Sequence, residues 1–223
     1  MKKKPVTTPK AGSRAKPAST RQEPAAEDQG KSRQRILDAA ATVLSREGFA
    51  GAKLTDIAAQ ADLRAATLYY YYESREALVE AVMVTGSEHV RHHTEEMLAN
   101  LDPSLNAVDR LCAAVESHLR VVLEISDYTQ AVIRNAGQVP QHIRQALDTE
   151  IARYGKLWQG LVDAAAEGTV FRTRAERRTL RLLILGGLNW TVEWWSASHT
   201  PLDEVVKTAT LMTRAMLRKG PVS

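Results

Sequence analysis

The sequence predicts an all-α protein, for two reasons. Between residues 32 and 218, apolar residues recur three and four positions apart, which is the spacing of one face of a helix. No stretch alternates apolar and polar residues over the length of a strand, and no hairpin turn joins two apolar runs. We therefore expect a basic tail over residues 1–31, a small helical domain over 32–76 and a larger helical domain over 77–223.

The composition indicates a globular protein of the cytoplasm. Of the 223 residues, 44% are hydrophobic and 25% charged, and Cys112 is the only cysteine. A single cysteine excludes an intramolecular disulfide and fits a reducing compartment. No apolar core of a signal peptide follows the amino-terminal lysines. The most apolar run, 180–195, is interrupted by polar and charged residues and is too short to cross a bilayer, so we expect no membrane partner.

The amino-terminal segment is rich in Pro, Lys, Ala, Ser and Thr and lacks periodic apolar residues, which predicts that residues 1–31 are disordered. Eight basic and three acidic residues give it a charge of +5, against +4 for the whole chain. The remaining residues therefore sum to −1, so the basic pI reflects the tail alone. The tail is either a solubilising segment or an arm that contacts nucleic-acid phosphates.

The next elements read as a helix over 31–46, stopped by Gly48, and then two short helices. The first short helix has Thr55 as its expected N-cap. Its apolar face consists of Leu54, Ile57, Ala58 and Ala61. The pattern breaks at Asp62 and resumes over 65–69. Two short helices joined by a tight turn and packed through alanines form a helix-turn-helix, whose second helix enters the major groove of double-stranded DNA.

The same region carries a family resemblance. Its motifs are Arg35-Ile36-Leu37-x-Ala39-Ala40, Glu47-Gly48-Phe49, Thr55-x-Ile57-Ala58, Ala61-x-Leu63, Thr67-Leu68-Tyr69-x-Tyr71-Tyr72 and Ser74-x-Glu76-x-Leu78. With this spacing, residues 32–82 resemble the amino-terminal domain of TetR-type transcriptional regulators. The departures are Asp62 in place of glycine, Arg64 in place of a capping Ser or Thr, and Tyr72 in place of Phe.

The helix-turn-helix pattern and the family resemblance each indicate residues that contact DNA. The helix-turn-helix pattern points Arg64, Ala65, Thr67, Tyr69 and Tyr71 towards the groove. The resemblance implies contacts from Thr67, Tyr69, Tyr71 and Arg75, with Thr55 at a helix end suited to phosphate. Arg64 either reads a guanine or is a solvated charge. Four consecutive tyrosines cannot all face outward, so we expect Tyr72 and part of Tyr69 to pack inward.

The larger domain reads as a series of helices. Ser74 caps one that runs to about residue 100, and Asp102-Pro103 begins the next, which continues to about 125. The remaining helices are expected over 128–135, 140–168, 176–197 and 203–218.

The run 180–195 is apolar on two sides, so one side requires a partner outside its own domain. Gly186-Gly187 permits close helix approach, and the last helix has a matching apolar stripe. We expect a symmetric four-helix homodimer interface, which the resemblance also implies. Its predicted members are Leu180, Ile184, Gly187, Thr191, Val205, Ala209, Met212 and Met216. A dimer binds an inverted repeat with recognition helices about 34–36 Å apart, and a ligand that tilts the helix after Ser74 changes that spacing.

A second group either lines a ligand cavity or belongs to the core. Its members are Arg134, Tyr154, Trp158, Asn189, Trp190 and Trp194. Asn189 requires a hydrogen-bond partner within so apolar a run. The larger domain also resembles, more weakly, regulators of lipid and sterol catabolism that respond to acyl-CoA thioesters. The matching features are Val132-Ile133-Arg134, Val139-Pro140, Tyr154 with Trp158, Glu167-Gly168, Leu185-Gly186-Gly187-Leu188-Asn189-Trp190 and Trp194-Trp195.

An acyl-CoA effector would suit the tryptophans, with Arg134, Arg144 and Arg153 as candidate phosphate ligands. The alternative is a hydrophobic or cationic effector of a regulator of efflux or stress genes.

Metal and enzyme interpretations have less support. His89, His92 and His93 lie near glutamates, but a charged helix surface explains them, so we expect no metal and no cofactor. No nucleophile elbow, P-loop, HExxH or dinucleotide motif occurs. The sequence thus favours a ligand-responsive repressor over an enzyme with an appended helix-turn-helix or an architectural DNA-binding protein.

Overall fold

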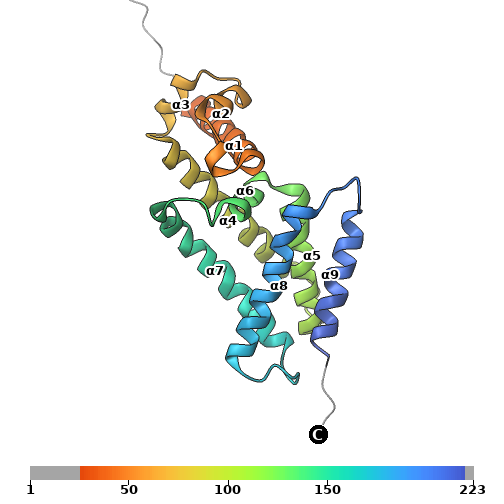
Figure 1. Ribbon diagram of the computed structural model, residues 1–223. Coiled ribbons are helices and arrows are strands. Elements are labelled where there is room, and N and C mark those ends of the chain that lie inside the picture. The colour runs from red at the N-terminus through yellow and green to blue at the C-terminus, as the bar shows by residue number, and fades with distance from the viewer. Residues whose placement is uncertain (1–25, 219–223) are drawn as a thin grey trace, which may run out of the picture.

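The computed structural model describes residues 26–218, which form nine α-helices and one π-helical segment and contain no strand. The all-α prediction is confirmed. Figure 1 shows α1–α3 gathered at one end of the molecule, with α4 running from them into a bundle formed by the later helices. The elements are α1 (Ala26–Gly51), α2 (Leu54–Gln60), α3 (Ala65–Tyr71), α4 (Arg75–Ala99), α5 (Ala107–Arg120), the π-helical segment (Val121–Ile125), α6 (Asp127–Asn135), α7 (Gln141–Ala165), α8 (Arg174–Trp194) and α9 (Leu202–Met216).

The first helix is longer than expected. It begins at Ala26, so residues 26–31, which the sequence assigned to the disordered tail, are helical. The prediction for residues 1–25 lies outside the described residues. Gly48 interrupts the helix with φ 69° and ψ 173°, a backbone conformation open to glycine and costly for other residues.

The caps confirm one prediction and correct two. The Ser74 hydroxyl accepts a hydrogen bond from Ala77 N at 3.0 Å and caps α4 as expected. Thr55 is not the N-cap of α2, because the helix already begins at Leu54 and Lys53 is its N-cap, without a side-chain bond. Asp102-Pro103 does not open α5. The Asp102 carboxylate accepts from Ser104 N within the loop, and Asn106 caps the helix by accepting from Asp109 N at 2.9 Å.

The buried core of α1–α3 continues into the larger domain. Leu78, Val82 and Met83 of α4 share one cluster with Ile36, Leu44 and Ile57 of the head. Tyr128 and Ala131 of α6 and Ile143 and Leu147 of α7 belong to the same cluster. The amino-terminal domain of α1–α3, which we call the head, therefore packs directly against α4, α6 and α7. A shift of these helices moves the head.

Gly86 allows α6 to lie directly against α4. A Cβ atom on Gly86 would lie 2.7 Å from the Tyr128 carbonyl carbon and 2.8 Å from Val132 Cγ2, and it would also collide with the Tyr128 carbonyl oxygen. The Thr129 hydroxyl donates to Gly86 O at 3.3 Å across the same contact. The closeness of the two helices depends on the missing side chain.

Within residues 26–218, no helix combines the length and the apolar character needed to cross a bilayer.

Candidate DNA interface, effector cavity and dimer surface

The turn between α2 and α3 positions the recognition helix. Asp62 adopts φ 54°, the left-handed region where the family resemblance expects glycine. Leu63 N donates to Ala58 O at 2.9 Å, and Arg35 Nη2 donates to Ala61 O at 2.5 Å, so backbone and α1 both fix the turn. Leu68 is buried and anchors the inner face of α3.

The outer face of α3 differs in part from the prediction. Arg64 and Tyr69 are exposed, and Ala65 and Thr67 are half-buried at its margin. Tyr72 is buried as expected, but Tyr69 is 60% exposed, so its predicted inward packing is wrong. Leu68 and Tyr72, four residues apart, already occupy the inner face.

Tyr71 is less exposed than predicted, and Tyr70, for which the sequence predicted no role, is exposed. Tyr71 is half-buried against the head core and is not directed fully outward. Its ring meets that of Tyr70 edge-on, with centroids 5.2 Å apart. Tyr70 is 65% exposed and was missed, because its neighbours matched the family motif and it did not. Thr55 is exposed in the first turn of α2, where a phosphate could approach.

Arg75 is held inside the head. Its Nε donates to Ala52 O at 2.8 Å and its Nη2 donates to Phe49 O. The guanidinium lies 4.4 Å from the centroid of the Phe49 ring, and Nη1 lies 3.6 Å from Glu76 Oε1. Arg75 thus ties the start of α4 to the end of α1 and to Ala52, and its predicted contact with DNA stays a prediction.

A cavity of about 720 Å³ lies between α4, α6, α7 and α8. Its size is typical of a small-molecule site. Of the six predicted ligand residues, Arg134, Tyr154, Asn189 and Trp190 line it. Trp158 is fully buried behind Tyr154, with ring centroids 6.1 Å apart. Trp194 is not in the cavity, because it lies in a groove that also contains residues of α9.

The polar centre of this cavity is His118, which the sequence analysis missed. Its Nδ1 lies 2.9 Å from the Tyr154 hydroxyl and its Nε2 lies 2.9 Å from Asn189 Oδ1, the partner that Asn189 requires. Burial lowers the pKa of His118 to about 4, so the ring is neutral at pH 7. Nε2–H then donates to Asn189 and Nδ1 accepts from Tyr154. The one sequence signal was a histidine within the inward apolar stripe of its helix.

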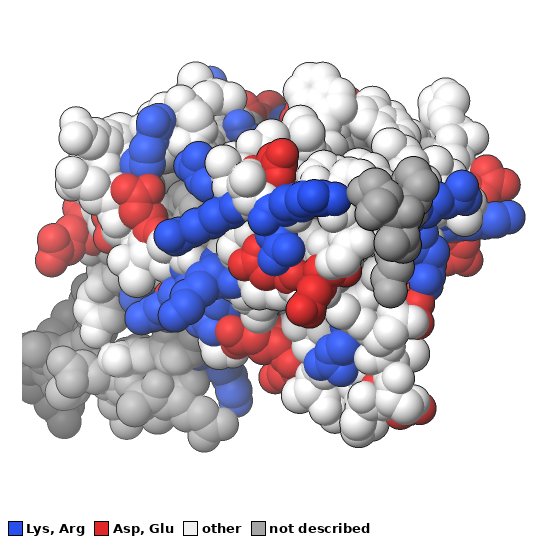
Figure 2. Space-filling model, turned by 90° about the horizontal axis from the view of Figure 1, so that it is seen from below, with Lys and Arg blue, Asp and Glu red and all other residues white. Residues whose placement is uncertain are grey.

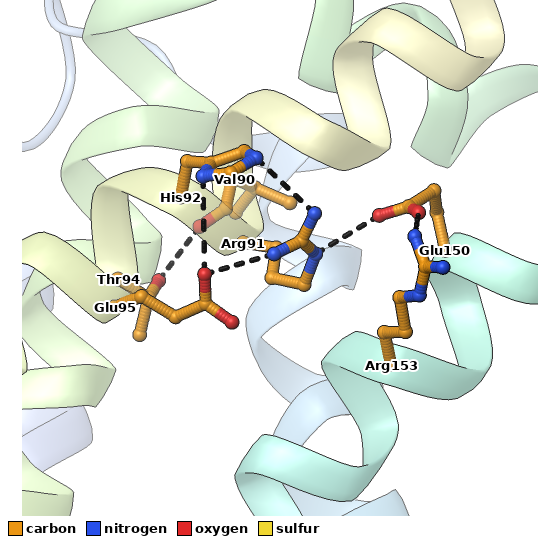
Figure 3. A network of polar contacts seen from close by, with 7 residues as sticks. All are labelled: Val90, Arg91, His92, Thr94, Glu95, Glu150 and Arg153. Carbon is orange, nitrogen blue, oxygen red and sulfur yellow. Dashed lines mark hydrogen bonds and ion pairs between the residues drawn. The ribbon is translucent and has the colours of Figure 1, made fainter.

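Glu150 is a buried carboxylate in the wall of the cavity, only 4% exposed. Figure 3 shows it between two arginines: Arg91 Nε of α4 donates to it at 2.9 Å, and Arg153 of α7 also donates to it. Burial raises the pKa of Glu150, but the hydrogen bonds and charge of Arg91 and Arg153 outweigh it and lower the pKa overall. The ion pair between Arg91 and Glu150 joins α4 to α7. Arg153, a predicted phosphate ligand, is paired with the same carboxylate.

Of the three histidines on α4, His92 contacts this ion-pair network. His92 Nε2 lies 3.2 Å from Arg91 Nη2 (Figure 3). Between residues 26 and 218, no group of three or more His, Cys, Asp or Glu side chains could hold a metal ion. Arg144, another predicted phosphate ligand, is exposed and outside the cavity, where it donates to Gly137 O at 3.2 Å.

The end of α6 connects the cavity to the head. Arg134 Nη1 donates to Ser45 O of α1 at 2.5 Å and Nη2 donates to Val192 O of α8 at 2.8 Å. The next residue, Asn135, donates to Leu44 O at 3.2 Å and accepts from Phe49 N at 2.5 Å. These bonds fall on both sides of the break at Gly48. One helix therefore forms a wall of the cavity and holds the end of α1.

The residues predicted for the dimer interface differ in their burial within the protomer. Leu180, Ile184, Thr191 and Val205 are buried. Ala209 and Met216 are half-buried, whereas Gly187 and Met212 are exposed as an interface requires. The exposed apolar surface, which we call the α8–α9 face, consists of Leu183, Gly187, Trp194, Leu211 and Met212. A groove of about 520 Å³ runs along it.

The opposite end of the molecule shows no surface of a single charge. Figure 2, seen from below the view of Figure 1, shows lysine and arginine side chains interleaved with acidic ones. Nothing on that face indicates a second nucleic-acid site.

Comparison with known proteins identifies the family of this chain. Residues 36–82 match the bacterial regulatory proteins of the tetR family, and residues 104–217 match the tetracyclin repressor-like C-terminal domain. The fatty acid metabolism regulator protein of Bacillus subtilis (strain 168) is 21% identical over 172 residues, which cover 76% of this chain and 86% of the relative.

Two solved structures share the fold. AibR in complex with isovaleryl coenzyme A and operator DNA has a TM-score of 0.73 and 19% identity, over 85% of this chain and 100% of AibR. FadR from Bacillus subtilis in complex with stearoyl-CoA has a TM-score of 0.66 and 18% identity, over 81% of this chain and 96% of FadR. The chain belongs to the TetR family of ligand-responsive, DNA-binding transcriptional repressors.

Proposed function

We propose that this repressor binds an inverted-repeat operator as a homodimer and is released when a hydrophobic acyl-CoA thioester occupies the cavity. The observation that carries the proposal is the cavity of about 720 Å³ whose α6 wall also holds the end of α1. The regulatory family further supports a non-enzymatic role in the cytoplasm.

The mechanism follows from the packing. A ligand that enters between α6 and α8 pushes on Arg134, which bonds to both α8 and α1. Because α4 and α6 meet without a side chain at Gly86, α4 moves with α6. The head packs against both helices and moves with them. The separation of the two recognition helices in the dimer then departs from the major-groove repeat of about 34–36 Å. The ligand shifts this equilibrium by its differential affinity for the released state.

The cavity supports an acyl group more than a cation. Its lining includes apolar side chains of Val90, Val132, Ile133 and Leu185, which suit a hydrocarbon chain. Both of its carboxylates are already paired, Glu150 with Arg91 and Glu193 with Arg134, so neither is left for a cationic ligand. AibR and FadR, which share the fold, are described with isovaleryl coenzyme A and stearoyl-CoA.

The direct test combines calorimetry with DNA release. Acyl-CoAs of several chain lengths, the free acids and hydrophobic cations are titrated into the protein, and compounds that bind are added to the operator complex. We expect acyl-CoAs to bind and release DNA. Binding and release by cations or neutral hydrophobes alone would refute the thioester assignment.

The DNA interface has its own prediction. Tyr69→Ala and Thr67→Ala are expected to weaken operator binding by about 5- to 150-fold, since one lost contact costs roughly 1–3 kcal/mol. Both side chains lie on the outer part of α3, so circular dichroism and thermal stability should stay near wild type. Binding is measured by fluorescence anisotropy at fixed salt. Unchanged operator affinity in both variants would remove these residues from the interface.

The dimer surface is tested at Gly187. A Cβ atom there meets nothing within 4 Å in its own chain, so Gly187→Leu should fold normally as a protomer. In a dimer packed through the α8–α9 face, overpacking of about 1–3 kcal/mol should weaken association by roughly tenfold or more. Sedimentation velocity over a dilution series measures this. Gly160→Leu on α7, equally open, is the matched control, and a dimer as tight as wild type would place the interface elsewhere.

A further inference from the structure

The arginines around the cavity differ in how their charge is neutralised. Arg91 and Arg153 pair with Glu150, and Arg134 pairs with Glu193. Arg181 also lines the cavity, but among residues 26–218 no carboxylate lies within ion-pair distance of it. Its Nη1 makes one long bond, 3.3 Å to Gly155 O, and its Nε is buried without a hydrogen-bond partner. A buried donor of a charged group left unpaired is unfavourable, so the side chain lacks an acceptor.

Gly155 of α7 leaves space for this guanidinium. Arg181 lies over Gly155 of α7, where a Cβ atom would come within 2.7 Å of Nη1. On α8 it shares one face with Leu185, Asn189 and Glu193, each four residues further on, and all of them line the cavity. With a rise of 1.5 Å per residue, the backbone positions of Arg181 and Asn189 lie about 12 Å apart along the helix.

We infer that Arg181 recognises the anionic group of the effector, a phosphate or carboxylate oxygen, while His118 and Asn189 face its less polar part about two turns of α8 away. This rests on the effector cavity of the proposed function and specifies its ligand as an anionic amphiphile. Guanidinium binds such oxygens through paired N–H donors. An anion in the cavity would give the guanidinium of Arg181 the charge partner that it lacks. The sequence predicts this role for Arg134, Arg144 and Arg153, but Arg134 and Arg153 are paired with carboxylates and Arg144 is outside the cavity.

Three dodecanoyl ligands test the inference by calorimetry on the full chain: dodecanoyl-CoA, dodecanoate and the neutral dodecanamide. Arg181→Gln is expected to weaken binding of the anionic ligand by about tenfold or more, because a charge-assisted pair is lost. Binding of dodecanamide should stay unchanged. Loss confined to dodecanoyl-CoA identifies a phosphate, whereas loss for dodecanoate as well identifies a carboxylate.

Control variants separate recognition from structure. Arg178→Gln removes the same charge from an exposed position of α8 and should have no effect. Arg181→Lys keeps the charge without the paired donors and should restore part of the affinity. Equal weakening of all three ligands in Arg181→Gln, or unchanged affinity for the anions, would overturn the inference.

Pyrophosphate alone, followed by thermal shift, separates this inference from the proposed function. If it stabilises the wild type but not Arg181→Gln, and no acyl compound binds, then only the acyl-CoA assignment fails. If neither pyrophosphate nor an anionic acyl compound binds the wild type, the anion site is refuted as well.

Discussion

Replacing Gly86 with alanine is expected to destabilise the protein by about 3 kcal/mol or more, at the upper end of overpacking costs. The added methyl group collides with the Tyr128 backbone and with Val132 Cγ2. Backbone atoms, unlike a side chain, cannot avoid the collision by changing rotamer. The thermal midpoint should fall by about 2–4 °C for each kcal/mol. Differential scanning calorimetry measures this directly.

The matched control for Gly86 is Gly160, a glycine in the neighbouring long helix α7. A Cβ atom at Gly160 meets nothing within 4 Å. Gly160→Ala should therefore raise stability by up to about 1 kcal/mol, the difference in helix propensity. Equal stability of Gly86→Ala and Gly160→Ala would show that α4 and α6 do not need their close contact.

His118 is expected to make the protein sensitive to acid. Its pKa is about 4 in the folded protein, against about 6.5 when unfolded. Between these values the unfolded chain binds a proton that the folded one does not, so the free energy of unfolding falls as the pH falls. The loss begins near pH 6.5 and reaches about 3 kcal/mol near pH 4, since one pKa unit corresponds to about 1.4 kcal/mol. Above pH 7 the contribution is constant.

Urea denaturation at pH 7, 5.5 and 4.5 and at one protein concentration tests this. His118→Gln is neutral at every pH and can still bond to Tyr154 and Asn189, so the variant should lose less stability on acidification. The exposed His142→Gln on α7 is the control and should behave as wild type. If His118→Gln loses as much stability as wild type between pH 7 and 4.5, another group causes the sensitivity.

The head was predictable because its local signals agree. The break at Gly48, the cap at Ser74 and the buried alanines of α2 each determine local backbone geometry, and the structure has them as expected. Arg75 was not predictable in this way. Its acceptors, Phe49 O and Ala52 O, are backbone atoms at the end of α1 and just after it, and no residue pattern shows where such a carbonyl points.

The bundle was less predictable for a reason that α8 illustrates. When a helix is apolar on two sides, its pattern does not show which side faces its own core, so the sequence placed Leu180 and Ile184 in the dimer interface although they are buried in the protomer. His118 was not predictable for a different reason. In the sequence it is one polar residue in an apolar stripe, and only its neighbours in space, Tyr154 and Asn189, identify it as the centre of a cavity.

The double role of α6 has a thermodynamic consequence. Because the helix that borders the cavity also grips α1 through Arg134 and Asn135, occupancy of either site biases the same element. Linkage then requires reciprocity: the factor by which effector weakens operator binding equals the factor by which operator DNA weakens effector binding. Protein bound at its operator therefore needs a higher effector concentration for the same occupancy than free protein does. A cell that carries many operator copies should respond at a higher effector concentration than one that carries few.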